Sequence, residues 1–269
     1  MSAPGKPLRA PGRTGVMAVF ARAAIAILLV LSLCHGILAA QSSGETAGFI
    51  IQLGRDTIAV EQYRRSDRAL ESELAVRVPF ARRVHFLAAL DTAGHMTQFD
   101  MTVRPLTHSV GRAATSTVTF HGDSADLTLM LGDSVRRLRI PTRPGAVPLS
   151  AFSASLIEQA ILQSRRAGRD SVEFDWLALG SPAATPSYVA RHGKDSVAVG
   201  FLGNPLLARV DGRGRLLGLD GRETTQKVVV TRVKAVNVGA YATAIGQAET
   251  AHGPTGQLSP RDTVRAEVA

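Results

Sequence analysis

Cysteine is nearly absent from this chain of 269 residues, and the single one, Cys34, excludes an intrachain disulfide. Aromatic residues make up only 5%, which disfavours single-stranded nucleic acid as a partner, because such binding relies on aromatic stacking. The content of 45% hydrophobic and 20% charged residues excludes a disordered chain and a multi-span membrane protein. We therefore expect a globular protein whose stability comes from burial of apolar surface.

Sequence motifs for catalysis are also missing. The chain contains no Gly-x-Ser-x-Gly elbow, no phosphate-binding Gly-x-x-x-x-Gly-Lys and no His-Glu-x-x-His. No two histidines after residue 40 are two or four positions apart, so no local metal pair exists. We assign no catalytic residue, no metal site and no cofactor.

The first forty residues have the layout of a secretory signal peptide. Arg22 precedes an apolar run over residues 23–33, and Ala39 and Ala40 are small residues suited to cleavage. Lipoprotein acylation needs a small residue before the cysteine, whereas Cys34 follows Leu33. We therefore expect Cys34 to be an ordinary apolar residue of the signal segment, with lipid attachment as the alternative. We expect residues 1–40 to be removed and the protein to be exported to the periplasm or cell envelope of a bacterium. An uncleaved segment acting as a membrane anchor is the alternative.

Alternation of apolar and polar residues dominates residues 48–233. Residues 84–90 are typical, since Val84, Phe86, Ala88 and Leu90 share one face of an extended strand. Short Gly- and Asp-rich segments separate such runs, and short connections imply antiparallel pairing. We expect about eight strands before residue 145 and about six after residue 168.

One helix is predicted between the two blocks of strands, at about residues 148–167. Ser150 is a candidate N-cap, Gly168 a candidate stop, and Ser155 and Glu158 lie off the apolar stripe. A stripe of this kind must be buried, and the sheet offers the only large apolar surface. The stripe consists of Leu149, Phe152, Leu156, Ile157 and Ala160.

The fold class that these patterns predict is mainly β. A twisted sheet of this size curls, so we expect a large curved antiparallel sheet, a half-barrel or incomplete barrel, with the helix covering its concave face. This architecture, over residues 48–233, resembles the periplasmic lipoprotein-carrier half-barrels, without a shared motif. We expect residues 41–250 to form this domain, with residues 236–245 as either a last strand or a short helix.

The C-terminal residues carry a second resemblance. Residues 258–268, with the sequence LSPRDTVRAEV, are similar to the opening strand of an exported bacterial family, domain of unknown function 2911. Residues 251–269 would then be a linker and the truncated start of a second β domain; a chance match is the alternative. The family implies no activity.

Four aromatic residues are the candidate ligand-lining positions. Phe86, Phe99, Phe174 and Trp176 each lie on the apolar face of a predicted strand. They could line a pocket for a lipid acyl chain or another apolar ligand, or form an ordinary packed core.

Arginines are concentrated at residues 136–143. Arg136, Arg137 and Arg139 could contact an anionic surface such as lipid headgroups, or form a solvated strand face. Export argues against nucleic acid as the anionic partner.

Three functions remain open. The leading interpretation is a non-enzymatic envelope protein that binds an apolar or amphipathic ligand. A scaffold upstream of a missing C-terminal domain is the second. The third is a hydrolase using residues from distant strands, such as His85, Asp100 or Glu61, with a hairpin turn at 91–94 placing His85 opposite Asp100.

Overall fold

The computed structural model describes residues 44–106, 112–150, 152–201, 204–222 and 227–252. The predicted signal peptide, with Cys34, and the resemblance at residues 258–268 lie outside these ranges.

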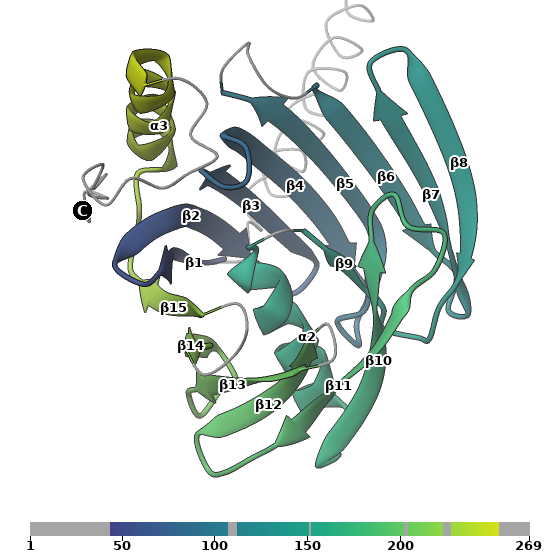
Figure 1. Cartoon of the computed structure of the whole chain (residues 1–269). Coiled ribbons are helices and arrows are strands. Elements are labelled where there is room, and N and C mark those ends of the chain that lie inside the picture. Colours follow the sequence, from purple (N-terminus) through teal and green to yellow (C-terminus); the bar gives the residue numbers. More distant parts are fainter. Residues whose placement is uncertain (1–43, 107–111, 151, 202–203, 223–226, 253–269) are drawn as a thin grey trace, which may run out of the picture. The chain divides into compact units, whose positions relative to one another are not determined.

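A single sheet of fifteen strands forms the described part of the chain (Figure 1). Its order is β8-β7-β6-β5-β4-β3-β2-β1-β15-β14-β13-β12-β11-β10-β9, so two meanders meet where β1 pairs with β15. The strands are β1 (Glu45–Leu53), β2 (Asp56–Arg65), β3 (Ala69–Val76), β4 (Arg82–Leu90), β5 (Met96–Pro105), β6 (Ala114–Phe120), β7 (Ser124–Leu131), β8 (Ser134–Pro141), β9 (Val147–Leu149), β10 (Ser171–Ala178), β11 (Thr185–Arg191), β12 (Ser196–Phe201), β13 (Asn204–Val210), β14 (Leu216–Asp220) and β15 (Val228–Val233).

The mainly β fold with a curved, unclosed sheet confirms the fold class expected from the alternation. One pairing departs from the antiparallel rule, because β9 runs parallel to β10, with Val147 opposite Trp176. The physical reason is the helix α2 (Ala154–Arg166) between these strands, which supplies the long crossover that parallel neighbours need. The sheet is therefore mixed.

Helix α2 covers the concave face of the sheet, as its apolar stripe predicted (Figure 1). It begins later than residue 148, because residues 147–149 pair as β9. Ser153, not Ser150, is the N-cap: its hydroxyl accepts the Leu156 N–H at 3.4 Å. Phe152 precedes the cap with φ +68°, in the left-handed region that few residues other than glycine adopt.

A second helix, α3 (Val238–His252), corrects the expectation of a single helix and settles residues 236–245 as largely helical. Its place beside the sheet is shown in Figure 1. It packs on β2 and β3, and with them forms a second apolar cluster separate from the main core. Val60 and Ala75 point into this cluster, so β2 and β3 are buried on both faces here. Its members are Val60, Ala75, Ala81, Val236, Val238, Tyr241, Ala242 and Ile245.

The predicted pairing of His85 with Asp100 is wrong. The turn is one residue longer than expected, since the Asp91 N–H bonds the His95 carbonyl and Leu90 lies opposite Met96. An irregularity then inserts Thr97 on β5, because Ala89 lies opposite Gln98. Together the two shifts place His85 opposite Thr102 and Asp100 opposite Leu87. A β-bulge moves every subsequent pair along the strand, which a turn-based count cannot anticipate.

Candidate functional site

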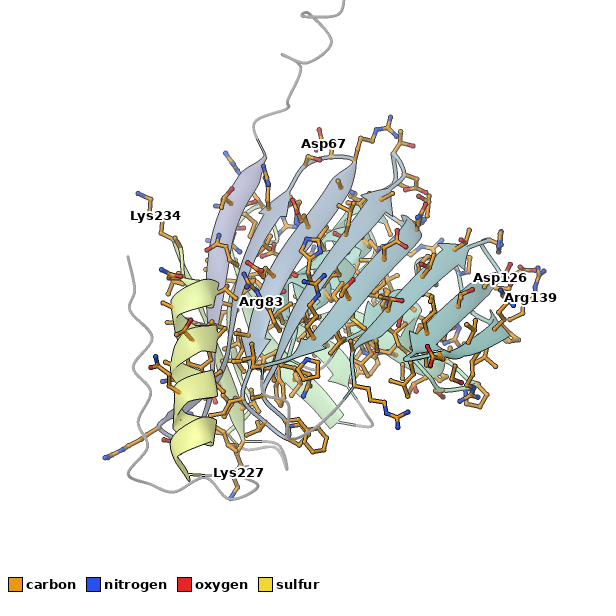
Figure 2. The ribbon with its side chains drawn as sticks, turned by 90° about the horizontal axis from the view of Figure 1, so that it is seen from above. Asp67, Arg83, Asp126, Arg139, Lys227 and Lys234 are labelled. Atoms are coloured by element: carbon orange, nitrogen blue, oxygen red, sulfur yellow. The ribbon has the colours of Figure 1, made fainter. Side chains whose placement is uncertain are left out.

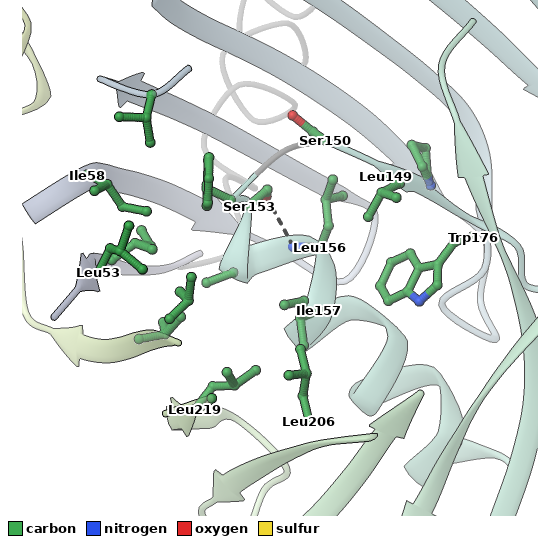
Figure 3. A pocket seen from close by; sticks show the side chains of 18 residues that line it. Leu53, Ile58, Leu149, Ser150, Ser153, Leu156, Ile157, Trp176, Leu206 and Leu219 are labelled. Carbon is green, nitrogen blue, oxygen red and sulfur yellow. Dashed lines mark hydrogen bonds between the residues drawn. The ribbon is translucent and has the colours of Figure 1, made fainter. Parts of the chain in front are cut away.

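A partly open cavity of about 500 Å³ lies between the N-terminal half of α2 and the concave face of the sheet (Figure 3). Its size falls within the range typical of small-molecule sites. The wall consists of Ile51, Leu53, Ile58, Val78, Pro148, Leu149, Ser150, Phe152, Ser153, Ala154, Leu156, Ile157, Trp176, Leu206, Leu219, Gly221, Val228 and Val230.

The cavity wall is almost wholly apolar. Among the described residues of the wall, none carries a charged side chain, and only Ser150 and Ser153 contribute hydroxyls. The Trp176 indole N–H donates to the Gly200 carbonyl at 2.9 Å, so its polar group is already satisfied. Such a wall favours a hydrocarbon guest, since a charged or strongly polar group would lose its hydration without gaining partners.

Of the four predicted ligand-lining aromatics, only Trp176 contributes to this wall. Phe174 contacts Trp176 edge-on, with ring centroids 4.8 Å apart. Phe86 and Phe99 are fully buried and pack against each other at 5.2 Å in the core. The structure thus brings the four together as two separate pairs.

A buried carboxylate lies immediately behind the cavity wall. Glu61, on β2, is fully buried and accepts the backbone N–H groups of Ala154 and Ser155 at 2.7 and 3.1 Å. Its other oxygen accepts the hydroxyls of Ser155, Ser72 and Ser153 at 2.6, 2.7 and 2.9 Å. Glu61 therefore fixes the N-terminus of α2, where Ser153 and Ala154 also line the cavity.

A second polar group fixes the middle of the same helix. Glu158, fully buried on α2, accepts the Tyr63 hydroxyl at 2.7 Å and the Leu216 N–H at 2.8 Å, and pairs with Arg232 at 2.6 Å. Arg65 reaches Glu158 at 3.5 Å and also donates to Gln159. We call the set Glu61, Tyr63, Arg65, Glu158 and Arg232 the helix clasp.

Burial dominates the electrostatics of the clasp. Desolvation raises the pKa of Glu61 above its usual value, although hydrogen bonds from the hydroxyls of Ser155, Ser72 and Ser153 and from the Ser155 N–H oppose the shift. Desolvation likewise raises the pKa of Tyr63, which stays a neutral donor to Glu158.

The sequence interpretation missed this clasp. Ser155 and Glu158 lie off the apolar stripe, yet both are fully buried, because polar side chains of β2 meet them there. The signal was present in β2, where Glu61, Tyr63 and Arg65 alternate and so occupy one face. Polar residues with a period of two on an inward face indicate a polar partner.

The three residues named for a hydrolase are not brought together. His85 and Asp100 are partly exposed: His85 is 3.2 Å from Glu71, and Asp100 accepts the Thr117 hydroxyl at 2.8 Å. The register places both on the face of the sheet opposite to Glu61. Within the described ranges, no three His, Cys, Asp or Glu residues gather as a metal site.

The arginine-rich run lies on the edge strand β8. Arg136, Arg137 and Arg139 are exposed there. Arg139 is 3.9 Å from Asp126 on the neighbouring strand β7, and both are labelled in Figure 2.

Comparison with known proteins identifies no family: no family model and no curated protein matches the chain. Solved structures similar to part of this chain include two proteins of unknown function. A DUF1089 family protein from Pseudomonas aeruginosa is 17% identical, covers 62% of this chain and 91% of its own, and has a TM-score of 0.45. A β-barrel-like protein of domain of unknown function DUF1849 from Brucella abortus is 10% identical, covers 71% of this chain and 96% of its own, with a TM-score of 0.44. Among the described helices, neither is long and apolar enough to cross a membrane.

Proposed function

We propose that this protein is an exported, non-enzymatic envelope protein that holds an apolar chain, such as the acyl chain of an amphipathic ligand, in the cavity beside α2. The observation that carries the proposal is a cavity of about 500 Å³ whose described lining residues include no charged side chain. Apolar atoms around a void lose dispersion contacts, and a hydrocarbon guest restores them.

The helix clasp supports a permanent cavity in this proposal. A helix held only by apolar contacts could settle onto the sheet and fill the space. Glu61 and Glu158 instead tie α2 to β2, β14 and β15 through directional hydrogen bonds, which fix its height above the sheet. The cavity therefore stays preformed, and a ligand pays little reorganisation energy on entering.

Export in this proposal rests on the composition of residues 1–40, which have a basic start, an apolar run and small residues before Gln41. A periplasmic or envelope location would expose the protein to lipids.

Trp176 provides a direct test, because it is the only tryptophan of the chain and part of the cavity wall. Titration with a brominated long-chain fatty acid should quench its fluorescence saturably, since bromine quenches only at close range. Ile157→Glu, which places a charge in the cavity wall, should abolish the quenching. Leu207→Glu makes a similar change at a position 44% exposed and should leave the quenching intact.

Two results would refute the proposal. One is the absence of saturable quenching in the native protein; the other is equal quenching in Ile157→Glu and Leu207→Glu.

A further inference from the structure

The segment between β3 and β4 borders two hollows at once. Val78 belongs to the wall of the apolar cavity. The next four residues, 79–82, line a separate groove of about 350 Å³, together with Val103, Pro105 and Arg112. The two hollows are therefore neighbours along the chain, divided by this short segment.

The groove combines apolar surface with positive charge. Phe80 is 51% exposed, the most exposed of the large hydrophobic side chains in the described residues. Arg82 and Arg112 also line the groove, and none of its described lining residues is acidic. The Arg82 guanidinium donates to the Phe80 backbone carbonyl at 3.1 Å, which ties this cation to the segment that carries the exposed ring. Neither arginine takes part in an ion pair within the described part of the chain.

Further exposed apolar side chains lie along the same edge of the sheet. The register pairs Arg82 with Pro105, Val103 with Ala114 and Ala114 with Leu131. The β3–β4, β5–β6 and β7–β8 connections therefore lie at the same end of their strands, and "this edge" means that end of the sheet. Met130, Leu131 and Val135, at the β7–β8 turn, are 46%, 43% and 46% exposed. Exposed apolar groups gathered at one edge are typical of an interaction site.

We propose that this edge docks on the surface of an anionic phospholipid bilayer, with Phe80 entering the interface and Arg82 and Arg112 contacting lipid phosphates. Charge complementarity selects this partner: two guanidinium groups beside an exposed ring match a surface that is anionic outside and apolar beneath. The inference rests on the proposed function in one respect, that the bilayer is the source of the chain. Val78 would then lie between the docked surface and the cavity.

Sedimentation with phospholipid vesicles tests the proposal. The protein should bind mixed vesicles of phosphatidylcholine and phosphatidylglycerol. Its affinity for vesicles of phosphatidylcholine alone should be lower by at least roughly tenfold. Phe80→Ser and the double variant R82Q/R112Q should each weaken binding to the mixed vesicles by roughly tenfold. Higher salt should also weaken binding of the native protein to the mixed vesicles, because it screens the attraction between arginine and phosphate.

Matched controls use exposed residues outside the groove. Leu207→Ser removes an apolar side chain of similar exposure, 44%, and R68Q/R213Q removes two exposed arginines from the β2–β3 and β13–β14 turns, at the opposite end of the strands. Both controls should bind the mixed vesicles as the native protein does. Native binding that is absent, or equal on neutral and anionic vesicles, would overturn the proposal. So would R68Q/R213Q losing binding while R82Q/R112Q keeps it.

Quenching of Trp176 by the brominated fatty acid separates the two proposals. R82Q/R112Q should retain this quenching while losing vesicle binding, because its groove lies outside the cavity wall. Vesicle binding without fatty-acid quenching in the native protein would support the docking edge and refute the acyl-chain cavity. Quenching without vesicle binding would support the acyl-chain cavity and refute the docking edge.

Discussion

Glu61 and Ala154 are 93 residues apart in the chain, yet the Ala154 N–H donates to the Glu61 carboxylate at 2.7 Å. The first N–H groups of a helix have no partners within the helix and carry the positive end of its dipole. A carboxylate from the sheet supplies both an acceptor and a negative charge at that end. The position of α2, and with it one wall of the cavity, therefore depends on a side chain of β2.

Glu61→Ala is expected to lower the free energy of unfolding by about 3–5 kcal/mol, because it leaves buried donors without an acceptor. Glu61→Gln should cost less, since its amide still offers one acceptor oxygen. Urea denaturation measures both. Glu71→Ala removes an exposed carboxylate of the neighbouring strand and should change stability by at most about 1 kcal/mol. Equal losses at the two positions would contradict the anchoring role of Glu61.

The raised pKa of Glu61 predicts a pH dependence of stability. In the folded state this group binds its proton more tightly than in the unfolded chain, where its pKa is near 4.5. Its contribution to the free energy of unfolding is therefore fully present below the unfolded pKa and is lost as the pH rises through the folded pKa. Glu61→Gln lacks this contribution.

Urea denaturation of the native protein and Glu61→Gln at several values between pH 4.5 and 7 measures the difference. The stability advantage of the native protein over Glu61→Gln should shrink as the pH rises. An advantage that grows over this interval would show that the hydrogen bonds outweigh desolvation and that the pKa is lowered.

Tyr63 and Glu158 should be energetically coupled. The Tyr63 hydroxyl donates to Glu158 at 2.7 Å in a buried site, so Tyr63→Phe removes a hydrogen bond to a charged acceptor. We expect Tyr63→Phe to cost about 1.5–3 kcal/mol in the native background. In a Glu158→Gln background the same change should cost less, because the acceptor is then neutral. Additive costs in this double-mutant cycle would rule out the coupling.

The strand pattern was predictable because apolar and polar residues alternate within each strand. The predicted blocks of strands before and after α2 agree with the observed ones. The helix was predictable from its stripe. Residues 84–90 illustrate the success: the four even positions from Val84 to Leu90 are all buried, as expected.

The clasp was not predictable in the same way, because it depends on which strands α2 crosses. Nothing near Glu158 in the sequence indicates that Tyr63 and Arg232 meet it, since these contacts follow from a fifteen-strand topology. The ligand-lining residues could not be predicted for the same reason. Phe86 and Trp176 share the pattern of an inward apolar residue, yet only Trp176 lies where α2 leaves space.

The packing of α3 gives a last prediction, which separates stability from the cavity. Ile245 is fully buried in the second apolar cluster, on the side of β2 and β3 away from α2. Ile245→Ala should lower the free energy of unfolding by about 2–4 kcal/mol, through lost burial and the void left behind. Thr243→Ala, at an exposed position of the same helix, should change it by less than about 0.5 kcal/mol. Because the cavity is lined from the concave face, fatty-acid quenching of Trp176 should be unchanged in Ile245→Ala below its unfolding transition. A loss of quenching in the folded variant would mean that the two faces of the sheet are coupled, against this arrangement.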